Sequence, residues 1–351
     1  MCSFFKAKDM GIDLGTANTL IYLKDTGIIL NEPSVIAVDS DVSKILAVGK
    51  DAKEMIGKAP RNISVVRPLQ DGVISDFDKT ADMLRTFIER AMEQKKMRNY
   101  RVAVGVPTGV TEVEKRAVEE VVRQMGATEV YILEEPMAAA IGAGLPIDGT
   151  TGCMIADIGG GTTDVAIIAL GGVVSSTSIR HAGDKFNDAI VQYMRKRYAL
   201  LIGDNTAEEL KINLGCACMD EDEFGNEIIK TMNARGRDII SGLSKTLEVT
   251  NKDVMIALQE SMDIVIDAIK TTIEKAPPEI AADIAENGMM LSGGGANIYN
   301  LDKLIKKKTD MDVEIAGNSF EAVAMGTGKA LEDIEKLKIY TRKSKRRGTE
   351  V

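Results

Sequence analysis

A glycine-rich turn between two apolar stretches occurs twice in this chain, and this repeat constrains the fold most strongly. The second copy reads Cys153-Met-Ile-Ala-Asp-Ile-Gly-Gly-Gly-Thr-Thr-Asp-Val-Ala-Ile-Ile-Ala-Leu170, which predicts a β-hairpin. Consecutive glycines let the backbone approach a ligand and adopt positive φ where the turn needs it, and their N–H groups can line an anion site. Asp157, at the end of an apolar strand, suits a metal-bound water. A tight hairpin without a ligand would show the same pattern, so this copy alone does not establish a binding site.

The first copy lies near the N-terminus and reads Met10-Gly-Ile-Asp-Leu-Gly-Thr-Ala-Asn-Thr-Leu-Ile-Tyr-Leu23. Two copies this far apart indicate two homologous halves that face each other rather than a solenoid of short units. We therefore expect the two hairpins to clamp one polyphosphate, with a metal ion between Asp13 and Asp157.

A third glycine cluster, Gly288-Met-Met-Leu-Ser-Gly-Gly-Gly-Ala-Asn297, precedes a helix predicted from Asn300. Such a strand–turn–helix unit lets a flat ring lie against bare backbone, although an ordinary turn would also fit. A strand predicted at Val130–Leu133 delivers Glu134 and Glu135 just before a helix of small residues. Strand ends beside helix starts are where open α/β sheets place ligands.

Length and charge limit the alternatives. At 351 residues, two domains are the natural expectation. A net charge of −9 argues against broad nucleic-acid affinity. No apolar run approaches the ~18 residues of a membrane span, and the first eight residues lack the apolar core of a signal peptide. We therefore expect a cytoplasmic protein.

Cysteine and histidine usage points to structural roles. The spacing of Cys2, Cys153, Cys216 and Cys218 does not resemble a zinc site, and we interpret them as free thiols. The single histidine, His181, is interpreted as structural, and nucleophilic catalysis by a Ser–His or Cys–His pair is not expected.

Several further elements follow from local patterns. Thr111 and Glu114 form a capping box that begins a helix. Helices are also predicted over Asp76–Lys95, from Gly183, from Thr206, over a periodic stretch ending at Pro277-Pro278, and over Ala322–Ile334. Short strands such as Glu227–Met232 are expected within the polar segment 216–250.

The three glycine-rich motifs, in this order, resemble those of the ATPase superfamily that contains actin, the heat-shock chaperones and the sugar kinases. Four longer strings, namely Gly11–Leu20, Asn31–Val35, Glu134–Gly142 and Lys275–Glu279, are similar to the MreB family of bacterial actins. The resemblance covers about residues 9–335. It implies an α/β actin-like ATPase fold with two duplicated halves around a nucleotide cleft, each carrying a smaller subdomain.

The resemblance also implies a division of the chain. Residues 9–32, 74–148 and 317–335 would form subdomain IA, 33–73 subdomain IB, 149–181 with 251–316 subdomain IIA, and 182–250 subdomain IIB. Residues 1–8 would be a membrane-contact segment and 336–351 a basic tail.

Site residues carry over by the same resemblance, with ATP or ADP and Mg²⁺ as cofactors. Asp13 and Asp157 would hold Mg²⁺ through water, as this cation prefers. Glu135, assisted by Thr162, would orient or activate the attacking water, with Glu134 the weaker candidate. The nucleotide would bind Thr16, Ala17, Asn18, Gly159, Gly160, Gly161, Thr162, Gly183, Asp184, Glu208, Lys211, Gly293, Gly294, Gly295 and Ala296.

The two ends of the chain suggest membrane attachment. The tail is rich in lysine and arginine, and each such residue near an anionic leaflet contributes about 1 kcal/mol. The predicted membrane residues are Phe4, Phe5, Lys343, Lys345, Arg346 and Arg347. A loop with Met97 and Tyr100 is a further candidate contact. A solvated, disordered tail is the alternative. For Lys58, a sensor or interface role and an ordinary solvated lysine both stay open.

The expected function is a slow ATPase that polymerises into membrane-associated filaments determining cell shape, located on the inner face of the cell membrane. Its expected partners are itself, anionic lipids and membrane proteins of a shape or wall-synthesis complex, with no nucleic acid. A role in the motility of a wall-less bacterium stays open. The alternatives are a small-molecule kinase or a plasmid-segregating actin on the same fold; a chaperone would need a peptide-binding domain after residue 335.

Overall fold

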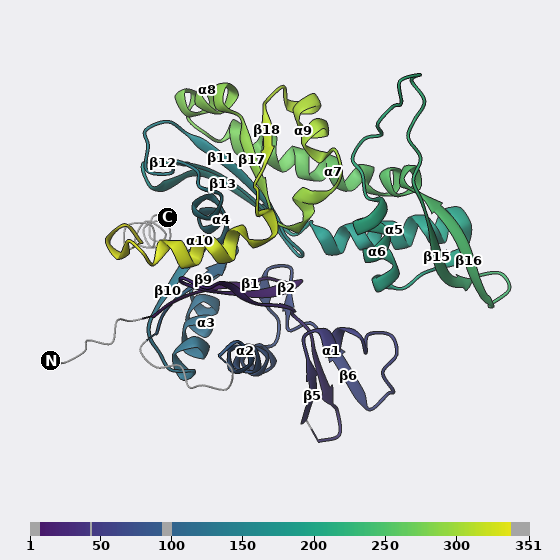
Figure 1. The fold of residues 1–351 in the computed structure, drawn as a ribbon, viewed down its shortest axis with the longest axis horizontal. Coiled ribbons are helices and arrows are strands. Elements are labelled where there is room, and N and C mark those ends of the chain that lie inside the picture. Colours follow the sequence, from purple (N-terminus) through teal and green to yellow (C-terminus); the bar gives the residue numbers. More distant parts are fainter. Residues whose placement is uncertain (1–7, 43, 93–99, 338–351) are drawn as a thin grey trace.

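Two five-stranded sheets with the same strand order form the two lobes of the protein (Figure 1). The computed structural model describes residues 8–42, 44–92 and 100–337. In lobe I the order is β10-β9-β1-β2-β3, and in lobe II it is β18-β17-β11-β12-β13. In each lobe an antiparallel meander of three strands is extended by two parallel strands. The predicted duplication of an α/β fold is therefore confirmed.

The strands of lobe I are β1 (Lys8–Leu14), β2 (Asn18–Leu23), β3 (Gly27–Pro33), β9 (Tyr100–Val106) and β10 (Ala127–Glu134). Those of lobe II are β11 (Cys153–Ile158), β12 (Thr163–Ala169), β13 (Gly172–Ile179), β17 (Met289–Ser292) and β18 (Val313–Ile315). Both predicted glycine-rich hairpins are present, as the β1–β2 and β11–β12 turns.

Helices α2 (Phe77–Ala91) and α3 (Glu112–Gln124) belong to lobe I, and α7 (Asn251–Glu274), α8 (Pro278–Asn287) and α9 (Leu301–Thr309) to lobe II. Helices α4 (Glu135–Ala143) and α10 (Ala322–Ala330) lie between the two sheets (Figure 1). The short 3-10 turns η1 (Gly294–Asn297) and η2 (Ser319–Glu321) complete these lobes.

Small residues let α4 and α10 pack closely. A Cβ added to Gly142 would lie 1.9 Å from the carbonyl oxygen of Ala322, and one on Gly326 would lie 1.7 Å from that of Ala138. The same buried cluster includes Ala103 of lobe I and Ile155 of lobe II. This helix pair therefore joins the two lobes through a shared core.

Each lobe carries a smaller unit, and both lie on the right in Figure 1. On lobe I it consists of β4 (Ile36–Asp39), β5 (Lys44–Val48), α1 (Lys50–Lys53) and β6 (Ile63–Val66), followed by β7 (Leu69–Gln70) and β8 (Val73–Ile74). On lobe II it consists of α5 (Gly183–Tyr198), β14 (Leu200–Leu201), α6 (Asp204–Leu214), β15 (Thr231–Asp238) and β16 (Ser244–Thr250). The exact subdomain boundaries stay a prediction.

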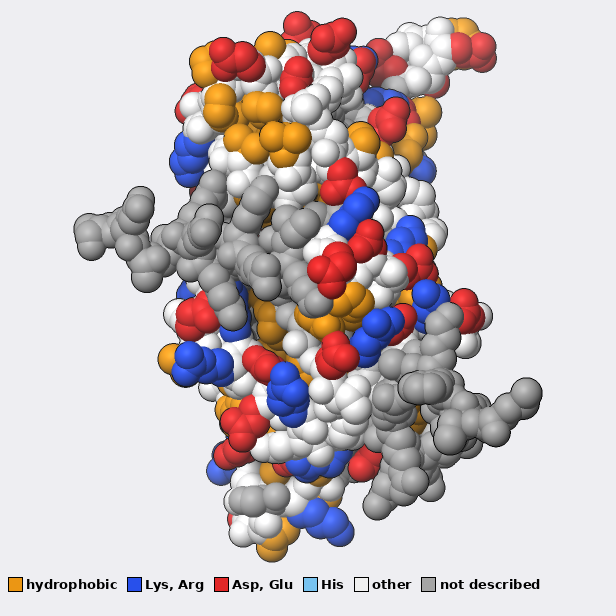
Figure 2. Space-filling view, turned by 90° about the vertical axis from the view of Figure 1, so that its left-hand side faces the viewer, with side chains coloured by type: hydrophobic (Ala, Val, Ile, Leu, Met, Phe, Trp, Pro, Cys, Tyr) orange, Lys and Arg blue, Asp and Glu red, His pale blue; other side chains and the backbone are white. Residues whose placement is uncertain are grey.

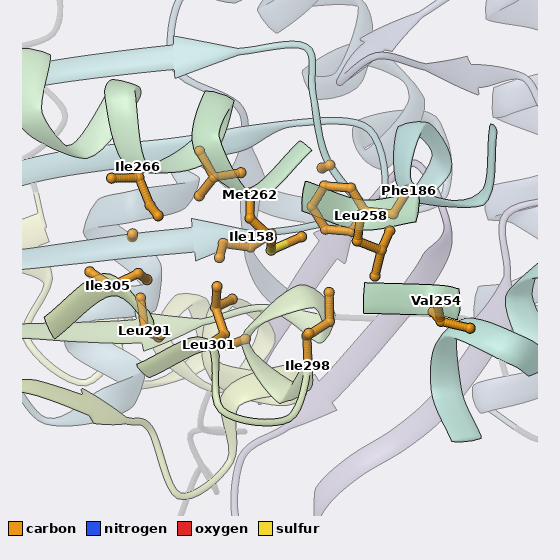
Figure 3. Packing of buried hydrophobic residues seen from close by; sticks show 14 of the residues in the cluster. Ile158, Phe186, Val254, Leu258, Met262, Ile266, Leu291, Ile298, Leu301 and Ile305 are labelled. Atoms are coloured by element: carbon orange, nitrogen blue, oxygen red, sulfur yellow. The ribbon is translucent and has the colours of Figure 1, made fainter. Parts of the chain in front are cut away.

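The core of lobe II lies directly behind its glycine-rich turn. Side chains of α7, with Leu258 and Met262 labelled in Figure 3, meet Ile158 of β11 and Phe186 of α5. All four are almost completely buried. Because Ile158 immediately precedes the turn, this packing fixes the turn on a rigid base.

Several predicted boundaries need correction. The strand predicted at Glu227–Met232 is wrong, because the structure forms the hairpin β15–β16 instead, with mostly exposed polar residues. Helix α6 begins at Asp204, two residues earlier than predicted, and α10 ends at Ala330. Helix α8 was not predicted, since Pro278 begins it rather than only ending α7. The capping box of Thr111 and Glu114 is confirmed.

Candidate functional site

A cavity of about 360 Å³ lies between the two lobes, within the usual range of ligand pockets. Its walls come from both glycine-rich hairpins, the third glycine cluster and both smaller units. The predicted site residues that line it are Asp13, Thr16, Ala17, Asn18, Glu135, Asp157, Gly159, Gly160, Gly161, Thr162, Gly183, Asp184, Glu208, Lys211, Gly293, Gly294 and Gly295. Residues far apart in the sequence are thus brought together around one cavity.

The two hairpin tips pack directly against each other. A Cβ added to Gly160 would lie 2.5 Å from the Cβ of Ala17, and one on Gly161 would lie 2.6 Å from Oγ1 of Thr16. None of the glycines from 159 to 161 has a positive φ, so this turn does not need left-handed backbone. Gly160 and Gly161 are required because the opposite hairpin approaches too closely for a side chain.

Helix α5 begins against the second hairpin. The N–H of Gly183 donates to the carbonyl of Gly159 at 3.1 Å, and that of Asp184 donates to Gly160 at 2.8 Å. Lys211 on α6 donates to the carbonyl of Gly183 at 2.9 Å, and burial lowers the pKa of this lysine. The positive end of the α5 dipole and a lysine therefore face the space where an anion would lie.

Three carboxylates converge at the base of the cavity. Asp13 is the second-last residue of β1, Asp157 is the second-last residue of β11, and Glu135, which is only 6% exposed, begins α4. Ser292 donates to Oδ1 of Asp157 at 2.6 Å. Burial and the charge of Asp157 raise the pKa of Asp13 to about 8. Burial, with the nearby charges of Asp13 and other carboxylates, also raises the pKa of Glu135 well above its ordinary value.

This acid group fits a water-coordinated Mg²⁺ better than a direct metal cage. Burial raises the pKa of Asp157 to about 7, partly opposed by the Ser292 hydrogen bond. Within residues 8–42, 44–92 and 100–337, no group of three or more His, Cys, Asp or Glu side chains could hold a metal ion. Mg²⁺ usually binds one or two carboxylates, several waters and substrate phosphates. Buried Asp157 and half-buried Asp13, which repel each other beside the glycine-rich hairpins, meet that requirement.

Glu135 and Glu134 differ in their access to the cavity. Glu135 lines it together with Thr162, whereas Glu134 is the N-cap of α4 and does not line it. Of the two neighbouring glutamates, Glu135 therefore faces the cavity, and its role there stays a prediction.

Two ion pairs cross the cavity between the smaller units, and sequence reasoning missed both. Lys53 Nζ lies 2.6 Å from Oε2 of Glu208, and Arg67 NH1 lies 2.8 Å from Oδ1 of Asp184. Neither Lys53 nor Arg67 belongs to a recognisable sequence motif. Each meets its partner only because distant segments of the chain come together in the fold. Lys58 is exposed and does not line the cavity.

The third glycine cluster forms the wall opposite α6. Gly293 has a φ of 80°, and an added Cβ would lie 2.3 Å from the carbonyl oxygen of Ile158. Phe320 and Ile212, which were not predicted, provide apolar walls. Ala296 does not line the cavity and is buried in the lobe II core.

The other predicted residues lie elsewhere. Phe4, Phe5, Met97, Lys343, Lys345, Arg346 and Arg347 lie outside the described residues. Tyr100 begins β9 and is buried in the core of lobe I, so its predicted surface contact is wrong. Cys153, Cys216 and Cys218 are free thiols as predicted. His181 lies beside the ring of Phe186 and not in the cavity.

The duplicated fold and this site define an actin-like nucleotide-binding protein. The sequence matches the MreB/Mbl protein family over residues 7–339. The chain belongs to the MreB/Mbl family.

Individual relatives agree with this assignment. The chain is 46% identical over 334 residues to the cell shape-determining protein MreB of Escherichia coli strain K12, covering 94% of each chain. It is 44% identical over 331 residues to the cell shape-determining protein Mbl of Bacillus subtilis strain 168, covering 94% of this chain and 98% of Mbl. The crystal structure of MreB5 of Spiroplasma citri bound to AMPPNP superposes with a TM-score of 0.87 at 38% identity, covering 94% of this chain and 97% of that one.

Proposed function

We propose that this protein binds ATP with Mg²⁺ in the cavity between its lobes and hydrolyses it slowly. The observation that carries the proposal is the pair of facing glycine-rich hairpins with Asp13, Asp157 and Glu135 at their base. MreB5 of Spiroplasma citri, which shares the fold at 38% identity, has been crystallised with AMPPNP and with ADP.

The residues of the cavity have separate roles in this proposal. Backbone N–H groups of Gly160 and Gly161 would bind phosphate oxygens, and the positive end of the α5 dipole would attract them. Asp13 and Asp157 would hold Mg²⁺ through waters. A bound Mg²⁺ would supply positive charge that stabilises the developing charge on the phosphate. Glu135 orients the attacking water and accepts its proton. Thr162 supports the same water.

We further propose that the nucleotide state controls assembly into filaments that determine cell shape. The relatives at 44% and 46% identity are named as cell shape-determining proteins. Head-to-tail contacts between identical subunits that do not close a ring produce filaments. The same filament would serve motility if the organism lacks a wall.

We propose that the two ends of the chain attach the protein to the inner face of the cell membrane. No helix among the described residues is long and apolar enough to cross a bilayer. On the face shown in Figure 2, the acidic and basic side chains of the described residues are intermixed rather than gathered into one basic patch. The basic residues 338–347 and the N-terminal phenylalanines would supply the lipid contact.

The test is ATP-dependent sedimentation with anionic and with neutral liposomes. The full chain is compared with one ending at Leu337, because Leu337 is buried in the core and has to be kept. If the full chain forms polymer that pellets with anionic liposomes, and the chain ending at Leu337 does not, the result supports both filament formation and attachment through the tail. Absence of polymer with every nucleotide would overturn the cytoskeletal proposal and favour a small-molecule kinase. Polymer without affinity for lipid would favour a plasmid-segregating actin.

A further inference from the structure

Three sulfur-bearing side chains lie within four residues directly after α6, outside the nucleotide cavity. Cys216 is 3% exposed, whereas Cys218 and Met219 are half-buried. None of the three lines the cavity. The proposed ATPase activity assigns no role to them.

The sulfur atoms of Cys216 and Met219 are close enough to share one ion. Cys216 Sγ lies 3.8 Å from Met219 Sδ. Two sulfurs bound to one ion at about 2.3 Å, the zinc–thiolate distance, would lie about 3.8–4.0 Å apart in tetrahedral or trigonal geometry. The third sulfur belongs to Cys218, two residues after Cys216 on the same segment, where its Sγ donates to the carbonyl of Asn300 at 3.7 Å.

The backbone holds this segment in place. The N–H of Ala217 donates to the carbonyl of Tyr299 at 2.8 Å, and the N–H of Tyr299 donates to that of Gly215 at 3.2 Å. Asn300 Nδ2 donates to the carbonyl of Cys218 at 3.1 Å. Because these hydrogen bonds fix the segment on both sides of Cys216, the sulfurs need little rearrangement to bind an ion.

We propose that Cys216, Cys218 and Met219 form a binding site for a soft monovalent metal ion, of which Cu(I) is the representative. Thiolate and thioether ligands select Cu(I) over harder cations. On binding, the thiol protons pass to solvent and the ion takes their place. The half-buried Cys218 and Met219 provide the path by which the ion reaches buried Cys216. Zinc fits less well, because no described His, Asp or Glu completes a cluster with these cysteines.

The experiment titrates anaerobic, reduced protein with Cu(I) against a chromophoric Cu(I) chelator. All variants carry Cys2→Ser, so that this additional thiol does not contribute. We expect one Cu(I) per chain, with affinity reduced at least about tenfold by Met219→Leu and by Cys216→Ser. The matched control is Cys153→Ser, because Cys153 is also a partly buried thiol whose pKa is raised to about 11, and it should leave affinity unchanged.

Met219→Leu keeps the test informative if Cys216→Ser does not fold, since it replaces one apolar side chain by another of similar size. Circular dichroism verifies the fold of each variant before titration. Binding that Met219→Leu leaves unchanged, or that Cys153→Ser weakens equally, would overturn the site. A protein that fails to compete with the chelator, or that binds Zn²⁺ at least as tightly as Cu(I), would also overturn it.

Discussion

The ammonium group of Lys53 lies 2.6 Å from the carboxylate of Glu208, joining the two smaller units across the mouth of the nucleotide cavity. The two side chains are 30% and 28% exposed, so the pair contributes at most about 1 kcal/mol to folding stability. Because both residues line the cavity, we expect the ion pair mainly to affect the opening and closing of the cleft between the smaller units. Lys53→Met should therefore accelerate release of a fluorescent ADP analogue by about two- to fivefold in stopped-flow experiments.

The control for Lys53→Met is Lys50→Met, which changes an exposed lysine on the same short helix that does not line the cavity. Equal release rates for Lys53→Met and the unmodified protein would show that the pair does not restrain the cleft.

Glu135→Gln tests the proposed role in hydrolysis. The amide retains the size of the side chain but cannot accept the proton of the attacking water, so we expect kcat to fall about 100-fold. Nucleotide affinity should change only slightly, since Glu135 lies at the base of the cavity. Phosphate release and nucleotide binding are measured side by side. Glu134→Gln, at the neighbouring position outside the cavity, should retain activity, and similar losses in both variants would contradict the assignment.

The sequence predicts this site well where the chemistry is local. Asp13, Asp157 and Gly159–Gly161 occur in two repeated hairpin motifs, and the repeat predicts that these residues face one cavity, as they do. Lys53 and Arg67 could not be predicted, because their roles arise only when lobe I and lobe II meet across the cleft.

For the fold as well, elements without a clear local sequence pattern could not be predicted. The duplicated sheets follow from two apolar hairpins, whereas β15–β16 was missed because its exposed polar residues lack an apolar alternation. Helix α8 was missed because Pro278 was interpreted only as the end of α7, although proline is also favoured in a first helical turn.

The raised carboxyl pKa values predict how the nucleotide-free protein responds to pH. Asp13 has a pKa of about 8 in the folded protein against 3.8 in the reference state. The folded state therefore binds more protons between these values, so the free energy of unfolding should fall as pH rises through this window. Between pH 6 and 8 we expect a loss of about 2 kcal/mol in protein freed of Mg²⁺ and nucleotide.

Chemical denaturation in EDTA at several pH values measures this loss. Asp13→Asn should flatten the pH dependence, and Asp25→Asn, in the exposed turn after β2, is the control. Unfolding free energies that rise from pH 6 to pH 8 would contradict the inferred protonation.

Gly160→Ala tests whether the two hairpins have to touch. The new Cβ would lie 2.5 Å from that of Ala17, so the hairpin tips would have to separate. We expect nucleotide affinity to fall at least about tenfold, because phosphate-binding N–H groups on the two sides would no longer face one ligand. Gly317→Ala is the control, since an added Cβ there meets no atom within 4 Å. Unchanged binding by Gly160→Ala would show that the cradle tolerates a wider spacing.

Phe320 offers a test of where the nucleotide base lies. Its ring lines the cavity, and an added Cβ on Gly294 would lie 3.4 Å from it, so the ring and the third glycine cluster form one apolar wall. Stacking of the base on this ring would contribute about 0.5–1.5 kcal/mol, and Phe320→Ala should therefore weaken ATP and ADP binding about three- to tenfold. Calorimetry measures both ligands together with inorganic triphosphate, which lacks a base and should be unaffected. Phe77→Ala is the matched control, because Phe77 is 39% exposed against 41% for Phe320 and lies outside the cavity. If triphosphate binding weakens as much as ATP binding, the ring acts on the phosphate region and the base lies elsewhere.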